Sequence, residues 1–215
     1  MPIPPQPYQL SWHGWISIDY NQNIWIPCPP VFPDGINRES WAKLYAEEWW
    51  SRTAGPYGKR QIRAMKRMLS EIHTYAYDNL AMHRGFLHLP AIGLSPLLVS
   101  FGIWEAVGDR DEQMRFLTRA NDPTLMQPPV IEEFGTEKLG QGIKVTTYTR
   151  NNKGVVTGYL NYAWRNEELA TAVRMFTGSS DLGRLQDAVH DIEELARTVA
   201  WVPWDRKAAQ AGHSA

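Results

Sequence analysis

Five cations stand close together in this sequence with the spacing of one helical surface. No acidic residue interrupts them before Glu71, and they begin the second long helix that the sequence predicts. Positive charge in the first turns of a helix opposes the helix dipole, so helix propensity does not account for the run. A surface that docks an acidic partner or phosphate groups would account for it. The five residues are Lys59, Arg60, Arg63, Lys66 and Arg67.

The alternative is a structural role in which these cations pair with acids of the preceding helix. Glu39, Glu47 and Glu48 are available for such pairs. The formal net charge of −1 lacks the positive excess that nucleic-acid binders show, so nucleic acid is a disfavoured partner. Nucleic-acid binding through the same helix remains a further hypothesis, and it requires an affinity that falls steeply with salt.

A second group combines acids and a histidine on one face of the final expected helix. Its members recur at offsets of three and four, a spacing with which helices can hold a metal ion. They lie opposite the apolar stripe, and Arg184 and Arg197 are placed to pair with them, so we favour a solvated face without metal. The four residues are Asp187, His190, Asp191 and Glu194.

Nucleophilic catalysis has little support in the sequence. Cys28 is the single cysteine, so neither an intrachain disulfide nor a cysteine zinc site can staple the fold. It lies between prolines, and a catalytic Cys28 would need His13 or His73 brought close by the fold, so we expect a small apolar residue. Phosphate-loop and dinucleotide motifs are incomplete at 55–60 and 135–142, and we expect no cofactor.

Residues far apart in the sequence could still assemble a site. His83, His88, Tyr148 and Trp164 are the candidates for an enzyme or a small-ligand binder. Such a site needs a pocket in which polar groups converge.

Hydrophobic periodicity, caps and turn residues predict the elements that position these side chains. The expected strands span 12–19, 24–27, 86–92, 97–105, 130–134, 143–150, 155–165 and 169–177, with the first two as an N-terminal hairpin. The expected helices span 37–52, 59–82 and 109–119, and Ser179, Ser180 or Asp181 caps a final helix.

Consecutive strands with tight turns imply an antiparallel sheet, and helices that are grouped rather than alternating imply an α+β fold. The 215 residues suffice for one domain with a sizeable core. We therefore predict a single α+β domain over 11–204 with a central antiparallel sheet flanked by helices. A proline-rich extended arm at 1–10 and a flexible tail at 205–215 complete the expected organisation.

Tryptophan is the compositional outlier, with ten residues in the chain. We favour a core between the N-terminal hairpin and the first helix, because large aromatic side chains are usually buried. An aromatic surface for a ligand or partner is the alternative. Six of the ten lie in the first 50 residues: Trp12, Trp15, Trp25, Trp41, Trp49 and Trp50.

The sequence also favours a cytoplasmic location without membrane contact. Its first residues, MPIPPQPYQL, lack the basic and apolar regions of a secretory signal. The longest mostly apolar stretch, 87–107, is interrupted by proline, glycine and polar residues, whereas a membrane helix needs about 20 apolar residues.

Three short stretches carry a resemblance to known proteins: LGQG at 139–142, YAWR at 162–165 and DLG at 181–183. With these stretches the chain resembles uncharacterised actinobacterial proteins over residues 85–200. Its element order is similar to that of Mog1/PsbP-like α/β/α sandwiches. The resemblance implies a binding or assembly role without catalysis, and it implies no particular site residue.

The leading functional hypothesis is a non-enzymatic protein-binding or adaptor domain. It depends on the basic helix, the tryptophans and the lack of a recognisable catalytic constellation. An enzyme or small-ligand binder is the rival hypothesis.

Overall fold

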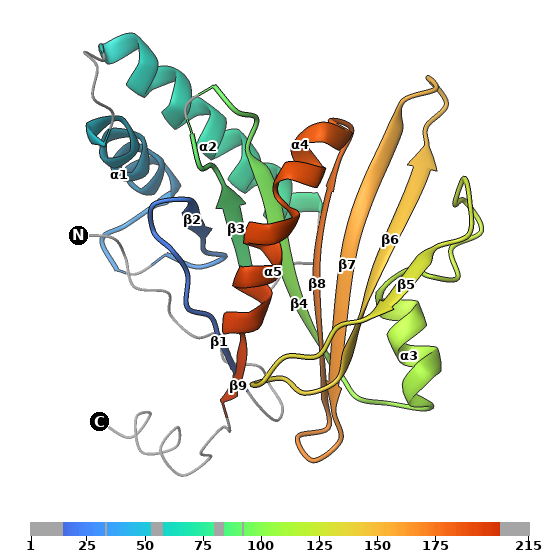
Figure 1. Cartoon of the computed structure of the whole chain (residues 1–215). Helices are drawn as coiled ribbons and strands as arrows, with labels where there is room; N and C mark the ends of the chain where they lie inside the picture. The colour runs from blue at the N-terminus through green and yellow to red at the C-terminus, as the bar shows by residue number, and fades with distance from the viewer. Residues whose placement is uncertain (1–14, 33, 53–57, 80–83, 92, 203–215) are drawn as a thin grey trace, which may run out of the picture.

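The computed structural model describes residues 15–32, 34–52, 58–79, 84–91 and 93–202, and an antiparallel sheet forms its centre. Seven strands of this described part build the sheet (Figure 1). In spatial order they are β2 (Trp25–Cys28), β3 (Arg84–His88), β4 (Leu97–Glu105), β8 (Thr171–Ser179), β7 (Val156–Asn166), β6 (Gly142–Arg150) and β5 (Val130–Glu133).

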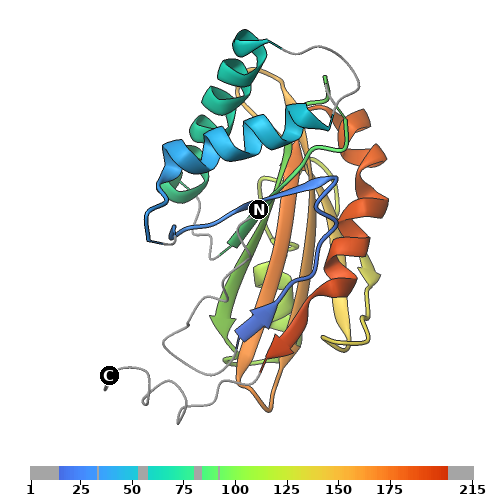
Figure 2. The same ribbon diagram turned by 90° about the vertical axis from the view of Figure 1, so that its left-hand side faces the viewer.

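Helices cover both faces of this sheet (Figure 2). On one face, α1 and α2 pack against β2, β3 and β4, and α3 packs against β7 and β8. On the other face, α4 and α5 pack against the main apolar core. The architecture confirms the predicted α+β domain with a central antiparallel sheet. The helices are α1 (Arg38–Ser51), α2 (Lys59–Asn79), α3 (Arg110–Leu117), α4 (Leu182–Asp187) and α5 (Val189–Thr198).

Local sequence signals account for the helix starts. Asn37 begins α1 with a capping box, in which its side chain accepts from the Ser40 backbone N–H at 2.9 Å and the Ser40 hydroxyl oxygen accepts from the Asn37 N–H at 2.8 Å. Asp109 and Asp181 cap α3 and α4 in the same chemical way. These caps agree with the positions that the sequence indicated.

The predicted N-terminal hairpin is wrong. β1 (Trp15–Ser17) does not pair with β2 but with β9 (Ala200–Val202), which ties the two ends of the described chain together. β2 instead joins β3 at the edge of the main sheet. The Asn-rich turn between the two expected strands is compatible with either pairing, so the choice depends on contacts that are distant in sequence.

Several boundaries also differ from expectation: β3 spans Arg84–His88 rather than 86–92, and β9 was not predicted. The final helix is interrupted at Ala188, whose N–H bonds to the Leu185 carbonyl at 3.2 Å in a tight turn before α5 begins. β8 begins at Thr171 rather than at 169, because Ala170 takes a positive φ of 46° in the preceding turn. The predicted arm at 1–10 and tail at 205–215 lie outside the described residues.

The described tryptophans largely build cores, as we favoured. Trp41 and Trp49 are buried between α1 and β2, and Trp25 is buried in the other core under α5. Trp50 is partly exposed, and its place is described below. The side chains of Trp12 and Trp15 lie outside the described residues.

Candidate functional site

An apolar pocket of about 440 Å³ opens between helices α1 and α2 and the loop that joins β3 to β4. Trp49 is only 7% exposed and forms a fixed wall, whereas Leu94 is 43% exposed at the rim. Apolar pockets of a few hundred Å³ are the usual size for an inserted ligand or side chain. Its main apolar lining is Trp49, Trp50, Met65, Met68, Leu89 and Leu94.

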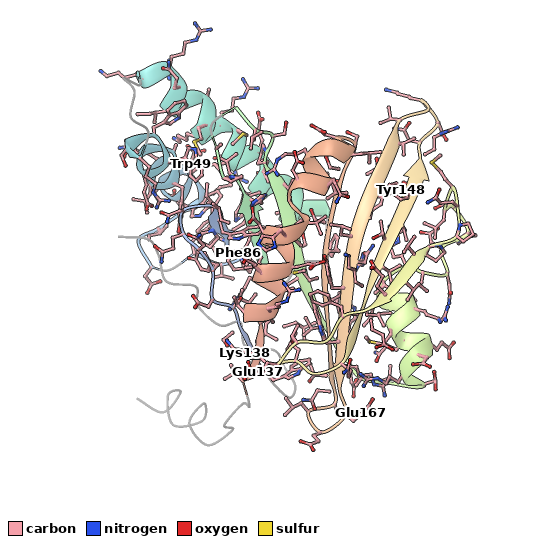
Figure 3. All side chains as sticks on the ribbon, in the orientation of Figure 1. Trp49, Phe86, Glu137, Lys138, Tyr148 and Glu167 are labelled. Atoms are coloured by element: carbon pink, nitrogen blue, oxygen red, sulfur yellow. The ribbon has the colours of Figure 1, made fainter. Side chains whose placement is uncertain are left out.

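The sequence positions these side chains through helical spacing. Gln61, Ala64, Met65 and Met68 line the pocket at offsets of three and four, so they form one face of α2. The next face of α2 carries the deeper core residues, including Leu69, which is fully buried. Figure 3 shows Trp49 beside α2, at the end of the molecule where both helices lie.

The structure divides the five predicted cations into two that form ion pairs and three that form none with the described residues. Lys66 Nζ lies 2.5 Å from Glu39 Oε2, and this hydrogen bond lowers the pKa of the Glu39 carboxyl. Arg67 pairs within its own helix, with Nε 2.7 Å from Glu71 Oε1. The structural alternative is therefore confirmed for Lys66, while Arg67 pairs with an acid that we had not considered.

The remaining three cations lie free of such pairs. Among the described residues, no ion pair involves Lys59, Arg60 or Arg63, and all three are exposed. Glu47 and Glu48 of α1 pair with Lys43 and Arg52 instead. The first turns of α2 therefore present three exposed positive charges on the same helix that lines the apolar pocket, but on a different face of it.

Arg184 was expected on a solvated face, and this prediction is wrong. The side chain is 5% exposed and reaches under the helix to the end of β3. Its Nη2 lies 2.8 Å from His88 Nδ1 and donates to the His88 carbonyl at 3.1 Å, and its Nε donates to the Ser95 carbonyl at 3.0 Å. Spacing on a helix cannot distinguish an exposed arginine from one that is buried by its hydrogen bonds.

The two ring nitrogens of His88 contact side chains of opposite charge. Because the arginine donates to Nδ1, the other nitrogen carries the proton and donates to Asp191 Oδ2 at 2.8 Å. The Trp25 ring lies over the imidazole at a centroid distance of 4.7 Å. Burial lowers the pKa of His88 below its ordinary 6.5, and the charge of Arg184 lowers it further against the opposing effect of Asp191.

This network predicts that stability falls with acidification below about pH 6.5. The unfolded chain takes up the proton at the ordinary pKa, whereas folded His88 resists it, so unfolded protein binds more protons in this range. We expect the urea midpoint to decrease from pH 7.5 to 5.5. A His88→Asn variant should start lower and lose less over the same range. Equal slopes for both proteins would contradict this role of His88.

The other members of the acidic group do not converge. Asp191 is occupied by His88, and His190 lies 3.3 Å from Glu194 on the exposed side of α5. In the part of the chain that the structure describes, no group of three or more His, Cys, Asp or Glu side chains could hold a metal ion.

Cys28 is fully buried, as expected for a small apolar residue. Burial raises the pKa of its thiol far above the ordinary value, so the thiolate required of a nucleophile is strongly disfavoured. His73 does not act as its base, because His73 Nε2 lies 2.8 Å from the Pro29 carbonyl oxygen. The other candidate base, His13, lies outside the described residues.

The residues of the rival site are dispersed. His88 on β3 and Tyr148 on β6 are separated in the sheet by β4, β8 and β7, and Figure 3 shows Tyr148 on the far side of the molecule from Trp49. Trp164 is fully buried in the core. His83 lies outside the described residues. The structure therefore does not bring His88, Tyr148 and Trp164 into one site.

Comparisons with known proteins show a shared fold and little else. No family model matches the chain, and no curated protein matches it in sequence. Among solved structures, the chain is similar to the crystal structure of LpqN, a protein involved in cell envelope biogenesis of Mycobacterium tuberculosis. The TM-score is 0.50 at 10% sequence identity, over 92% of this chain and 90% of that chain. The likeness to this neighbour therefore extends to the fold alone.

Two further observations complete the description. Within the described residues, no helix is both long enough and apolar enough to cross a membrane. The sequence analysis does not predict the pocket, because Met65 and Met68 recur at a helical spacing that a core-facing stripe also has. The adjacent pair Trp49-Trp50 was the available signal, because consecutive residues of a helix point in different directions and two such large side chains extend beyond a narrow core stripe.

Proposed function

We propose that this protein is a non-enzymatic binding domain that holds an acidic partner protein at the α1–α2 pocket. An apolar side chain of the partner would enter the pocket, and acidic residues of the partner that reach across α2 would contact Lys59, Arg60 and Arg63. The observation that carries the proposal is that one helix, α2, both lines an open apolar pocket and presents three exposed cations that form no ion pair with the described residues. Lys66 and Arg67, which we also proposed as partner-binding residues, contribute charge at the edge of this surface.

Physical chemistry supports the combination of the two features. Protein interfaces concentrate affinity in a few buried apolar or aromatic anchors, and rim charges mainly set orientation and association rate. Here Trp49 and Met65 are buried enough to be held in place, so the pocket is preformed. The three cations are exposed in the unbound protein, so they keep their hydration and carry no desolvation free energy before a partner binds.

Affinity purification from the native host tests this proposal. Soluble and envelope fractions are each passed over the tagged protein at low and at high salt, and bound proteins are quantified. A Leu94→Glu variant places an acid at the apolar rim, and an Arg60→Glu/Arg63→Glu variant reverses the charge of the surface. Lys153→Glu, on the exposed turn between β6 and β7, is the control.

We expect one protein to be retained stoichiometrically by the wild type and the control. Its retention should drop about tenfold for each surface variant, because one places a charge in an apolar contact and the other repels the acidic partner. Equal retention by all four proteins would contradict the proposed surface. Recovery of nucleic acid that disappears at high salt would favour the nucleic-acid hypothesis instead.

The cytoplasmic location and the Mog1/PsbP-like relationship remain predictions. LpqN is involved in cell envelope biogenesis, and a related role for this chain would place the partner in the envelope fraction. The likeness extends to the fold alone, so the fraction that contains the partner decides between the two locations.

A further inference from the structure

A second candidate site lies around Arg174 of β8, on the face of the central sheet that also packs α3. The strand register places Arg174 opposite Gly102 on β4 and Ala163 on β7, so its two lateral neighbours are small. The same face packs α3 through Ala163 and Ala172. The arginine is partly exposed, and the Trp104 ring lies over Gly102 on one side of it.

Contacts hold the guanidinium in place but do not satisfy it. Its Nη2 donates to Asn161 Oδ1 at 2.8 Å, and its Cζ lies 4.1 Å from the centroid of the Phe176 ring. Arg174 Nε is buried and has no acceptor among the described residues. Asn161 is 1% exposed, and its Nδ2 is also buried without an acceptor.

Two buried donors on adjacent strands therefore lack an acceptor in the same place. Buried donors are nearly always hydrogen-bonded, because leaving one unsatisfied costs about 1–3 kcal/mol. The Asn161 amide cannot flip to resolve this, since its oxygen is held by the arginine. An oxygen acceptor that bridges Asn161 Nδ2 and the guanidinium would satisfy both residues.

The charge is uncompensated as well. Within the described residues, no carboxylate forms an ion pair with Arg174. Burial, together with the nearby positive charge of Arg119, lowers the pKa of Arg174 to about 10, so the side chain is still charged at neutral pH. Arg119 is 58% exposed in its side chain and pairs with Asp122 at 2.9 Å. Two cations thus face one region, and buried charges are ordinarily paired.

We infer that Arg174 and Asn161, with Arg119 at the rim, bind an anionic oxygen group, either a carboxylate or a phosphate. One anionic oxygen accepts from Asn161 Nδ2 and a second accepts from the guanidinium of Arg174. The Phe176 ring packs against the planar guanidinium of Arg174 and holds it in a cation–π contact. This site is separate from the α1–α2 pocket and does not depend on the function proposed for it.

Inorganic phosphate and acetate are the probes, each compared with chloride at equal ionic strength. The urea midpoint is measured against anion concentration, because a ligand that binds only the native state stabilises it by a saturable amount. The Arg174 Nε–H resonance is followed by NMR in the same titration. The variants are Asn161→Asp, Arg174→Gln and Arg119→Gln, and Lys153→Gln is the control for a general loss of positive charge.

Asn161→Asp is the decisive variant. It supplies a carboxylate at the atom that already contacts Arg174, so the protein should remain folded and should no longer respond to the added anion. We expect a saturable rise of the midpoint for the wild type and Lys153→Gln, no rise for Arg174→Gln, and about threefold weaker binding for Arg119→Gln. A response to phosphate alone, or to acetate alone, identifies the anion.

Two results would overturn the inference. One is a wild-type protein whose midpoint and Nε–H resonance do not respond to either anion beyond the chloride control. The other is an anion response that persists undiminished in Asn161→Asp, because that response must then arise elsewhere on the molecule.

Discussion

Replacing Trp41 with alanine is expected to reduce the free energy of unfolding by about 4 kcal/mol. The side chain is fully buried at the centre of the core between α1, α2 and β2. Its ring lies 5.4 Å from that of His73 and 5.8 Å from that of Tyr45, and its Nε1 donates to the Pro27 carbonyl at 3.1 Å. Truncation leaves a cavity and an unsatisfied carbonyl together.

Urea unfolding followed by circular dichroism measures this loss. Trp41→Phe keeps most of the ring volume and removes the hydrogen bond, so it should lie between the wild type and Trp41→Ala. Phe116→Ala is the matched control, because Phe116 is 73% exposed and its truncation should change stability by less than about 0.5 kcal/mol. A loss below about 1 kcal/mol for Trp41→Ala would show that this core does not anchor α1.

The functional consequence follows from the same packing. α1 carries both Trp41 and Trp49, and the second of these forms the fixed wall of the pocket. A variant that loosens α1 should therefore weaken partner retention without touching the pocket surface. Comparison with Leu94→Glu separates this indirect effect from a direct one, because Leu94 is at the exposed rim.

Arg184→Met is expected to cost about 3 kcal/mol, since methionine fills the space but donates no hydrogen bond. Three acceptors lose their donor at once: His88 Nδ1, the His88 carbonyl and the Ser95 carbonyl. Two of these acceptors belong to His88, which is only 1% exposed, and buried acceptors without a donor are costly. The urea midpoint of the purified variant gives the loss.

Arg197→Met on the neighbouring helix is the appropriate control. Arg197 is 51% exposed and pairs with Glu193 at 3.2 Å, so its removal should cost less than about 1 kcal/mol. Equal losses for the two variants would mean that the buried contacts of Arg184 add nothing beyond a surface ion pair. The His88 response to pH should also change in Arg184→Met, because its Nδ1 is then free to take a proton.

The sequence by itself determined most of the elements, although it missed β9 and the division of the final helix into α4 and α5. The helix start at 37, the helix start at 59 and the strands on either side of 151–154 depend on signals that act over a few residues, and each is found close to where it was predicted. Asn151 illustrates the reason, because its side chain accepts from the N–H groups of Lys153 and Val155 within the same turn. The antiparallel α+β class followed from the order of these elements.

Tertiary structure alone decided which strands pair and which polar side chains are buried. β1 found its partner at the opposite end of the chain, and Arg184 bonds to His88 across 96 residues. Helical spacing shows which face of a helix carries a residue. Whether that face is buried depends on the elements that pack against it. The α1–α2 pocket and the unsatisfied Arg174 arise in the same way, because each forms only where elements distant in sequence come together.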